Sequence, residues 1–158
     1  MTMRTTIIAA GAAALLAGCA TAGAPRAELA ATLTGIQEVP GPGDPDATGT
    51  AEIRVDPAQG QLCWNLYVRQ TDAATAAHIH RAPAGSAGPP VVTLATPGPD
   101  GHSEGCAAVE DLLGRQIAMQ SHLFYVNVHT AAFPNGALRG QLRGEPNPRT
   151  RLRPAGAH

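Results

Sequence analysis

The sequence predicts an all-β fold: an antiparallel β-sandwich or barrel with one short helix near residues 109–120. Two observations carry this prediction. Apolar and polar residues alternate over several short segments, as they do in strands with one buried face, and the clearest run is Leu62, Trp64, Leu66 and Val68. Glycine and proline are frequent, with 18 and 14 residues, which favours short strands and many turns over long helices.

Three strands are expected in the N-terminal half of the domain. Residues 28–39 alternate in part, and residues 48–56 place their apolar side chains on one face. A turn at 57–60 then leads into the alternating run at 62–68. The short turn between two alternating segments predicts a β-hairpin.

Four further strands and the helix are expected in the C-terminal half. The strands share β-favouring side chains between turn signals, and they cover residues 76–80, 91–94, 123–130 and 137–142. Residues 81–90 and 97–105 are rich in Pro and Gly and are expected to be loops. Apolar residues recur at helical intervals over 109–120, and two acids near its start suit the helix dipole.

The N-terminus has the pattern of a secretory signal. Arg4 precedes a short apolar run, which closes on Leu16-Ala17-Gly18-Cys19. This ending resembles the bacterial lipobox, in which the cysteine receives a lipid before cleavage. We therefore expect a signal peptide at 1–18, lipidation of Cys19 and a flexible spacer over 19–27. The alternative is an ordinary signal peptide with an incidental cysteine.

A lipidated Cys19 predicts an exported protein anchored to the membrane of the cell envelope. By resemblance to Gram-negative lipoproteins, Ala20 in place of an aspartate predicts the outer membrane, if the source is Gram-negative. The folded domain is expected over residues 28–144. Residues 145–158 are rich in Pro and Arg, and they predict a disordered tail.

Composition argues against nucleic acid and points to an oxidising compartment. The formal net charge is -1, and only 3% of the residues are aromatic, so neither a basic patch nor a stacking platform for bases is expected. With Cys19 lipidated, Cys63 and Cys106 remain. Two thiols in an exported chain predict one disulfide, and the alternative is a pair of metal-binding or redox thiols.

Histidine is the residue type that suggests chemistry. His78 and His80 share one face of an expected strand, because side chains alternate along a strand. On the strand at 123–130, Tyr125, Asn127 and His129 share the face opposite to the apolar one. If both strands turn their apolar faces to one core, the three histidines can converge on one ion, for which copper and zinc are the candidates. The alternative is a set of solvated or structural histidines.

Four residues are candidates for supporting this site: Glu38, Asn127, Tyr125 and Arg139. Glu38 ends a strand, where it could act as a ligand, a base or a structural acceptor. Arg139 is a candidate partner for a carboxylate such as Glu38, and an exposed arginine is the alternative. No catalytic residue is expected, because the chain has no P-loop, G-x-S-x-G or H-E-x-x-H motif.

A series of segments resembles the CHRD domain, the module first described in chordin. The resemblance covers roughly residues 28–143, and its segments are Leu33–Pro40, Ala77–His80, Val91–Leu94, Tyr125–Thr130 and Pro134–Leu142. One departure is Ala137, where the family often has glutamate. The resemblance implies an immunoglobulin-like or Cu/Zn superoxide-dismutase-like β-sandwich, and it implies no settled activity.

Three functions are therefore open at the level of sequence. The first is a non-enzymatic binding or interaction module of the cell envelope, whose partner is an envelope protein or another ligand. The second is a copper- or zinc-binding protein that uses His78, His80 and His129. The third is a redox enzyme similar to superoxide dismutase, which the absence of that enzyme's ligand spacing makes the weakest of the three.

Overall fold

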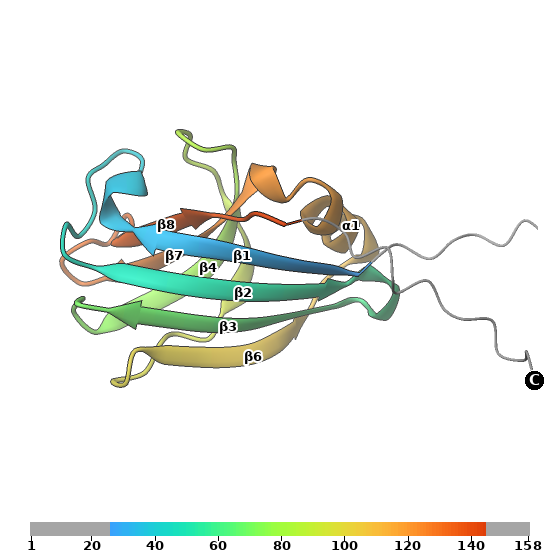
Figure 1. Ribbon diagram of the computed structural model, residues 1–158, viewed down its shortest axis with the longest axis horizontal. Helices are drawn as coiled ribbons and strands as arrows, with labels where there is room; N and C mark the ends of the chain where they lie inside the picture. Colours follow the sequence, from blue (N-terminus) through green and yellow to red (C-terminus); the bar gives the residue numbers. More distant parts are fainter. Residues whose placement is uncertain (1–25, 145–158) are drawn as a thin grey trace, which may run out of the picture.

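The computed structural model describes residues 26–144, and these form eight strands and one α-helix (Figure 1). The strands are β1 (Ala27–Thr34), β2 (Thr48–Asp56), β3 (Gln61–Arg69), β4 (Ala74–Arg81), β5 (Pro90–Leu94), β6 (His102–Ala108), β7 (Phe124–Thr130) and β8 (Leu138–Gln141). The helix α1 is Asp111–Met119, and single 3₁₀ turns lie at Gly35–Gln37, Pro57–Gln59 and Ser121–Leu123. The expected signal peptide, Cys19, most of the spacer and the tail lie outside the described residues.

The eight strands make one antiparallel sheet that curls into a nearly closed barrel. Its strand order is β5-β4-β7-β8-β1-β2-β3-β6. The two edge strands approach each other where the Ser103 hydroxyl at the start of β6 donates to the carbonyl of Ala95, just after β5, at 2.5 Å. Figure 1 shows β1, β2, β3 and β6 in the near wall, with β4 passing behind them. The predicted all-β fold with one short helix is confirmed.

The core lies inside the barrel, because each strand turns its apolar positions inward. Ile53 on β2, Leu62 on β3 and Val126 on β7 are among its fully buried members. The helix α1 adds Ile117, which is also fully buried. Burying a side chain of this size stabilises the fold by about 1.5–3 kcal/mol, so the alternating strands supply most of the driving force.

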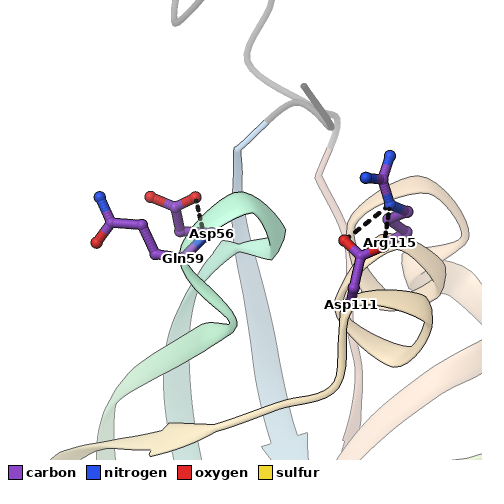
Figure 2. A network of polar contacts seen from close by, with 4 residues as sticks. All are labelled: Asp56, Gln59, Asp111 and Arg115. Carbon is purple, nitrogen blue, oxygen red and sulfur yellow. Dashed lines mark hydrogen bonds and ion pairs between the residues drawn. The ribbon is translucent and has the colours of Figure 1, made fainter. Parts of the chain in front are cut away.

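The end of the barrel near α1 is also where the described chain begins and ends. Figure 2 shows two short-range contacts there. Asp56 accepts a hydrogen bond from the backbone N–H of Gln59 at 3.3 Å and so caps the 3₁₀ turn between β2 and β3. On α1, Arg115 donates to Asp111 one turn earlier at 2.8 Å. Within the described residues, no helix is long and apolar enough to cross a membrane.

Strand β6 corrects the expectation of a loop at 97–105. Its inward positions carry small residues, so the sequence shows no apolar alternation. The reason is the bulk of Trp64 on β3, which pairs directly with Gly105: a Cβ on that glycine would lie 2.7 Å from the indole ring. The indole N–H donates to the Ser103 hydroxyl at 3.0 Å. One large side chain on β3 therefore fills the space that an apolar face of β6 would occupy.

The expected disulfide lies between β3 and β6. Cys63 and Cys106 are direct partners in the register of these strands, and their sulfur atoms are bonded at 2.12 Å. Both side chains lie on the outer face, opposite to the buried Leu62 and Trp64. The bond therefore fastens an edge strand that contributes few apolar contacts of its own.

Candidate metal centre

The three histidines predicted to share a face lie together on the outer face of the sheet. Strands β4 and β7 are antiparallel neighbours, with His78 opposite Asn127 and His80 opposite Tyr125. The alternate residues of both strands, such as Ile79 and Val126, point into the core and are fully buried. The adjacency of β4 and β7 is therefore what makes the shared face into a cluster.

The imidazole rings of this histidine cluster (His78, His80 and His129) are in close contact. Their ring centroids are 5.3–6.0 Å apart. One potential ligand nitrogen from each ring lies within 4.8 Å of those of the other two. Among the described residues, this is the only such group of three or more His, Cys, Asp or Glu side chains.

Hydrogen bonds to two backbone carbonyls orient two of the rings. Nδ1 of His80 lies 2.8 Å from the carbonyl oxygen of Gly88, and Nδ1 of His129 lies 3.0 Å from that of Pro134. A carbonyl oxygen can only accept, so each Nδ1 carries the proton and donates it. In the neutral ring the lone pair is then on Nε2, the nitrogen available to a metal.

Three other ring nitrogens in the cluster have no partner among the described residues. Nδ1 of His78, Nε2 of His80 and Nε2 of His129 are buried and make no hydrogen bond to any described residue. A buried polar atom without a partner is costly, so such atoms call for an explanation. Three in one cluster, each able to offer a lone pair, fit a metal ion.

Burial and the neighbouring charges favour the neutral form of two of the three rings. Burial lowers the pKa of His78 below its ordinary value, and the nearby His129 and His80 lower it further. Burial also lowers the pKa of His80, against the hydrogen bond to Gly88, which raises it. Both rings are therefore neutral at pH 7, and neutral imidazole is the form that binds metals.

Glu38 lies in a pocket that two glycines create. Its side chain is only 7% exposed. A Cβ on Gly136 would meet the carboxylate oxygen Oε2 at 2.4 Å, and one on Gly43 would meet Cγ at 2.7 Å. The sequence Pro134-Asn135-Gly136 is thus more than a turn signal, because its glycine makes room for a buried acid. Glu38 is not among the residues whose ligand atoms form the cluster.

Burial raises the pKa of Glu38 from 4.5 to about 7. The positive charge of Arg139, the backbone N–H of Val39 and the side chain of Asn127 act in the opposite direction, but burial is the larger effect. Two buried oxygen atoms here, Oε1 of Glu38 and Oδ1 of Asn127, have no hydrogen-bond partner among the described residues. The pocket therefore moves the ionisation of this acid from the usual acidic range to near neutral pH.

Arg139 does not form the expected ion pair with Glu38. The ion pairs among the described residues are Arg26 with Asp56 and Arg115 with Asp111. Arg139 is instead almost completely buried, and its guanidinium donates to the carbonyls of Ser86 and Pro83 at 2.8 and 3.0 Å. The loop 82–89 covers this arginine, which explains why it is not exposed.

Two other histidines lie apart from the cluster. His102 is the first residue of β6, where its ring stacks on Tyr67 and its Nε2 lies 2.8 Å from Oδ1 of Asn65. His122 is exposed in the 3₁₀ turn before β7. Neither residue belongs to the cluster, so among the described residues three histidines are the candidate ligands.

The donor set fits copper or zinc chemically. Imidazole nitrogens bind zinc at about 2.0–2.1 Å, which places the ligands of a tetrahedral site about 3.4 Å apart. The nitrogens of the cluster lie within 4.8 Å of one another, so small side-chain rotations bring them into range. Three ligands leave one position for water or a further donor.

Fold and site together define an all-β, barrel-like domain with a histidine cluster on its outer face. The family model of the CHRD domain matches residues 29–142, and the chain belongs to this family. No curated protein and no solved structure matches the chain. The family match supports a binding or interaction module.

Proposed function

We propose that this CHRD domain is a metal-binding module of the cell envelope, which holds copper or zinc through His78, His80 and His129. The observation that carries the proposal is the convergence of the three imidazoles, each with one potential ligand nitrogen within 4.8 Å of the others. Each ring also has one buried nitrogen with no hydrogen-bond partner among the described residues. Two of these rings are fixed by carbonyls in the tautomer that a metal requires. A structural role for the histidines would leave these nitrogens bonded to protein groups.

Copper is the first candidate, because the ligands are all imidazoles. Nitrogen sites bind divalent copper more tightly than zinc in the general order of first-row metals. The cluster contains no thiolate, since both cysteines of the described domain are used in the disulfide. The open position suits exchange of the metal with another protein. A redox enzyme would also use that position, so turnover is a separate question that metal binding alone does not answer.

The second candidate function is a non-enzymatic interaction module for an envelope protein or ligand, which the family match supports.

For either function we propose export and anchoring through a lipid on Cys19, because residues 16–19 have the Leu-Ala-Gly-Cys pattern. Strand β1 starts at Ala27 and ends at Thr34, which pairs with Arg139 near the site. Eight residues of strand span roughly 25 Å, so the proposed site lies well away from the anchored end.

The direct test is metal titration of residues 20–158 without an affinity tag. We expect copper or zinc to bind with micromolar or tighter affinity, measured by calorimetry and by competition with a chelator. His78→Ala/His80→Ala removes two of the three ligands and is expected to abolish this binding. His122→Ala is the matched control, because it removes an exposed histidine outside the cluster and is expected to bind like the wild type.

A wild type that binds neither metal would remove the proposed metal function. The histidines would then have structural or partner-contact roles, and the interaction module would become the leading function. Loss of binding in His122→Ala as well would show that the titration reports nonspecific surface sites.

The anchor is tested by Cys19→Ser. We expect the wild type in the membrane fraction, and the variant either soluble or with its signal uncleaved, because serine offers no thiol for lipidation. Cell fractionation and intact mass measure the two effects. Cys63→Ser/Cys106→Ser keeps Cys19 and serves as the control. Unchanged membrane fractionation and mass in Cys19→Ser would exclude the lipid anchor.

A further inference from the structure

The loop between β4 and β5, residues 82–89, is held against the outer face of the sheet by side chains of that face. Each of them bonds to the loop backbone: His80 to Gly88, Tyr125 to Gly88, Arg139 to Ser86 and Pro83, and Gln141 to Ala82. The loop itself consists of Ala, Pro, Gly and Ser, and most of it is exposed. The sheet therefore fixes the path of the loop through its backbone groups.

Gly88 is the point at which this loop comes closest to β4. A Cβ at this position would lie 1.9 Å from the carbonyl oxygen of Arg81 and 3.0 Å from the Cβ of Ala82. Only glycine permits this approach. The approach brings the carbonyl of Gly88 to 2.8 Å from Nδ1 of His80, where it sets the tautomer of that ring.

Tyr125 contacts both partners of that hydrogen bond. Its hydroxyl accepts from the N–H of Gly88 at 3.2 Å and lies 3.4 Å from the Gly88 carbonyl oxygen. Its ring stacks on His80, with centroids 5.0 Å apart and planes inclined by 20°. The guanidinium of Arg139 covers the Tyr125 ring at 3.5 Å. Arg139 therefore fixes the ring of Tyr125. Tyr125 in turn fixes the ring plane of His80 by stacking, and its hydroxyl fixes Gly88, whose carbonyl orients His80.

We propose that Tyr125 is a positioning residue of the metal site and acts through the carbonyl of Gly88 on His80. The tyrosine hydroxyl keeps the loop at the distance where that carbonyl accepts the Nδ1 proton. Nε2 of His80, which has no hydrogen-bond partner among the described residues, then carries the lone pair that a metal can use. The inference rests on the proposed metal function and adds a residue that does not itself bind the ion.

The test uses Tyr125→Phe in the full chain, with copper as the probe. Phenylalanine keeps the ring that stacks on His80 and removes only the hydroxyl. Copper affinity is expected to fall about 10- to 100-fold, the range seen when a group that orients a metal ligand is lost. Tyr67→Phe is the matched control, because Tyr67 is the other tyrosine of the chain and lies outside the cluster; its affinity is expected to be unchanged.

Two readouts separate positioning from a general loss of stability. Long-range ¹H–¹⁵N NMR of the metal-free protein reports the tautomer of His80, which is expected to change from Nδ1–H alone to a mixture in Tyr125→Phe. The Cu(II) electron paramagnetic resonance spectrum is expected to change with it. Gly88→Ala, which displaces the loop but keeps the hydroxyl, is expected to reproduce both changes.

Wild-type affinity and an unchanged tautomer in Tyr125→Phe would overturn the role of Tyr125. Loss of affinity in Tyr125→Phe with no effect in Gly88→Ala would overturn the route through the loop. A wild type that binds no copper or zinc is a different result: it overturns the proposed function, and the positioning role falls with it.

Discussion

Removal of the Cys63–Cys106 disulfide is expected to lower the free energy of unfolding by up to about 4 kcal/mol. The bond closes a loop of 43 residues, and the chain-entropy model assigns about this value to a loop of that length. Cys106 is exposed and Cys63 half-buried, so Cys63→Ser/Cys106→Ser leaves no large cavity. The loss therefore arises mainly from the greater freedom of the unfolded chain.

Urea denaturation in oxidising buffer measures this effect. Glu104→Ser is the matched control, because it changes an exposed side chain of the same strand and leaves the disulfide intact. Hydrogen exchange should rise most in β6, whose inward residues are small and give it little packing of its own. Equal denaturation midpoints for the double variant and the wild type would show that the disulfide adds nothing to stability.

Replacing Glu38 with glutamine is expected to raise the free energy of unfolding relative to the wild type, and to do so more at high pH. The difference between variant and wild type is expected to be about 2–3 kcal/mol larger at pH 8 than at pH 4. Burial raises the pKa of Glu38 from 4.5 to about 7. The folded state therefore binds this proton more tightly than the unfolded state does. The wild type should lose stability as the pH rises from 4.5 through about 7, because the acid must then ionise inside the fold. Glutamine stays neutral over this whole range.

The comparison is made by denaturation of both proteins at several pH values between 4 and 8. The lowered pKa values of His78 and His80 act in the opposite direction, since they cost stability as the pH falls. These terms are shared by both proteins and cancel in their difference. A difference between Glu38→Gln and the wild type that stays constant with pH would show that the pKa of Glu38 is not raised.

The alternation of side chains along two strands is enough to predict on which face of its strand each histidine of the cluster lies. His78 and His80 are two residues apart, and His129 lies on the polar side of a strand whose other positions are apolar. The period of two is a local property of an extended chain, so it can be read from the sequence. The adjacency of β4 and β7 cannot be read from the sequence in this way, because strand order depends on contacts between distant segments.

Local patterns misled where a distant residue determined the structure. The sequence predicts a loop over 97–105, but residues 102–105 belong to strand β6. The inward residues of this strand are small because they fit the indole of Trp64 from another strand. Residues 28–39 were expected to be one strand, but β1 ends at Thr34 and a 3₁₀ turn follows at Gly35–Gln37. Arg139 was expected to bond a carboxylate such as Glu38 or lie exposed, and it bonds carbonyls of the covering loop instead.

The sequence by itself determined the all-β class, the likeness to the CHRD family, the pairing of the two cysteines as an expectation and the three histidines of one face. Each of these follows from side-chain type and spacing within short segments. Only the tertiary structure decided that carbonyls of Gly88 and Pro134 orient His80 and His129, and that Gly136 makes room for a buried Glu38. The physical reason is that backbone atoms carry no sequence signal of their own, and burial is a property of the whole fold.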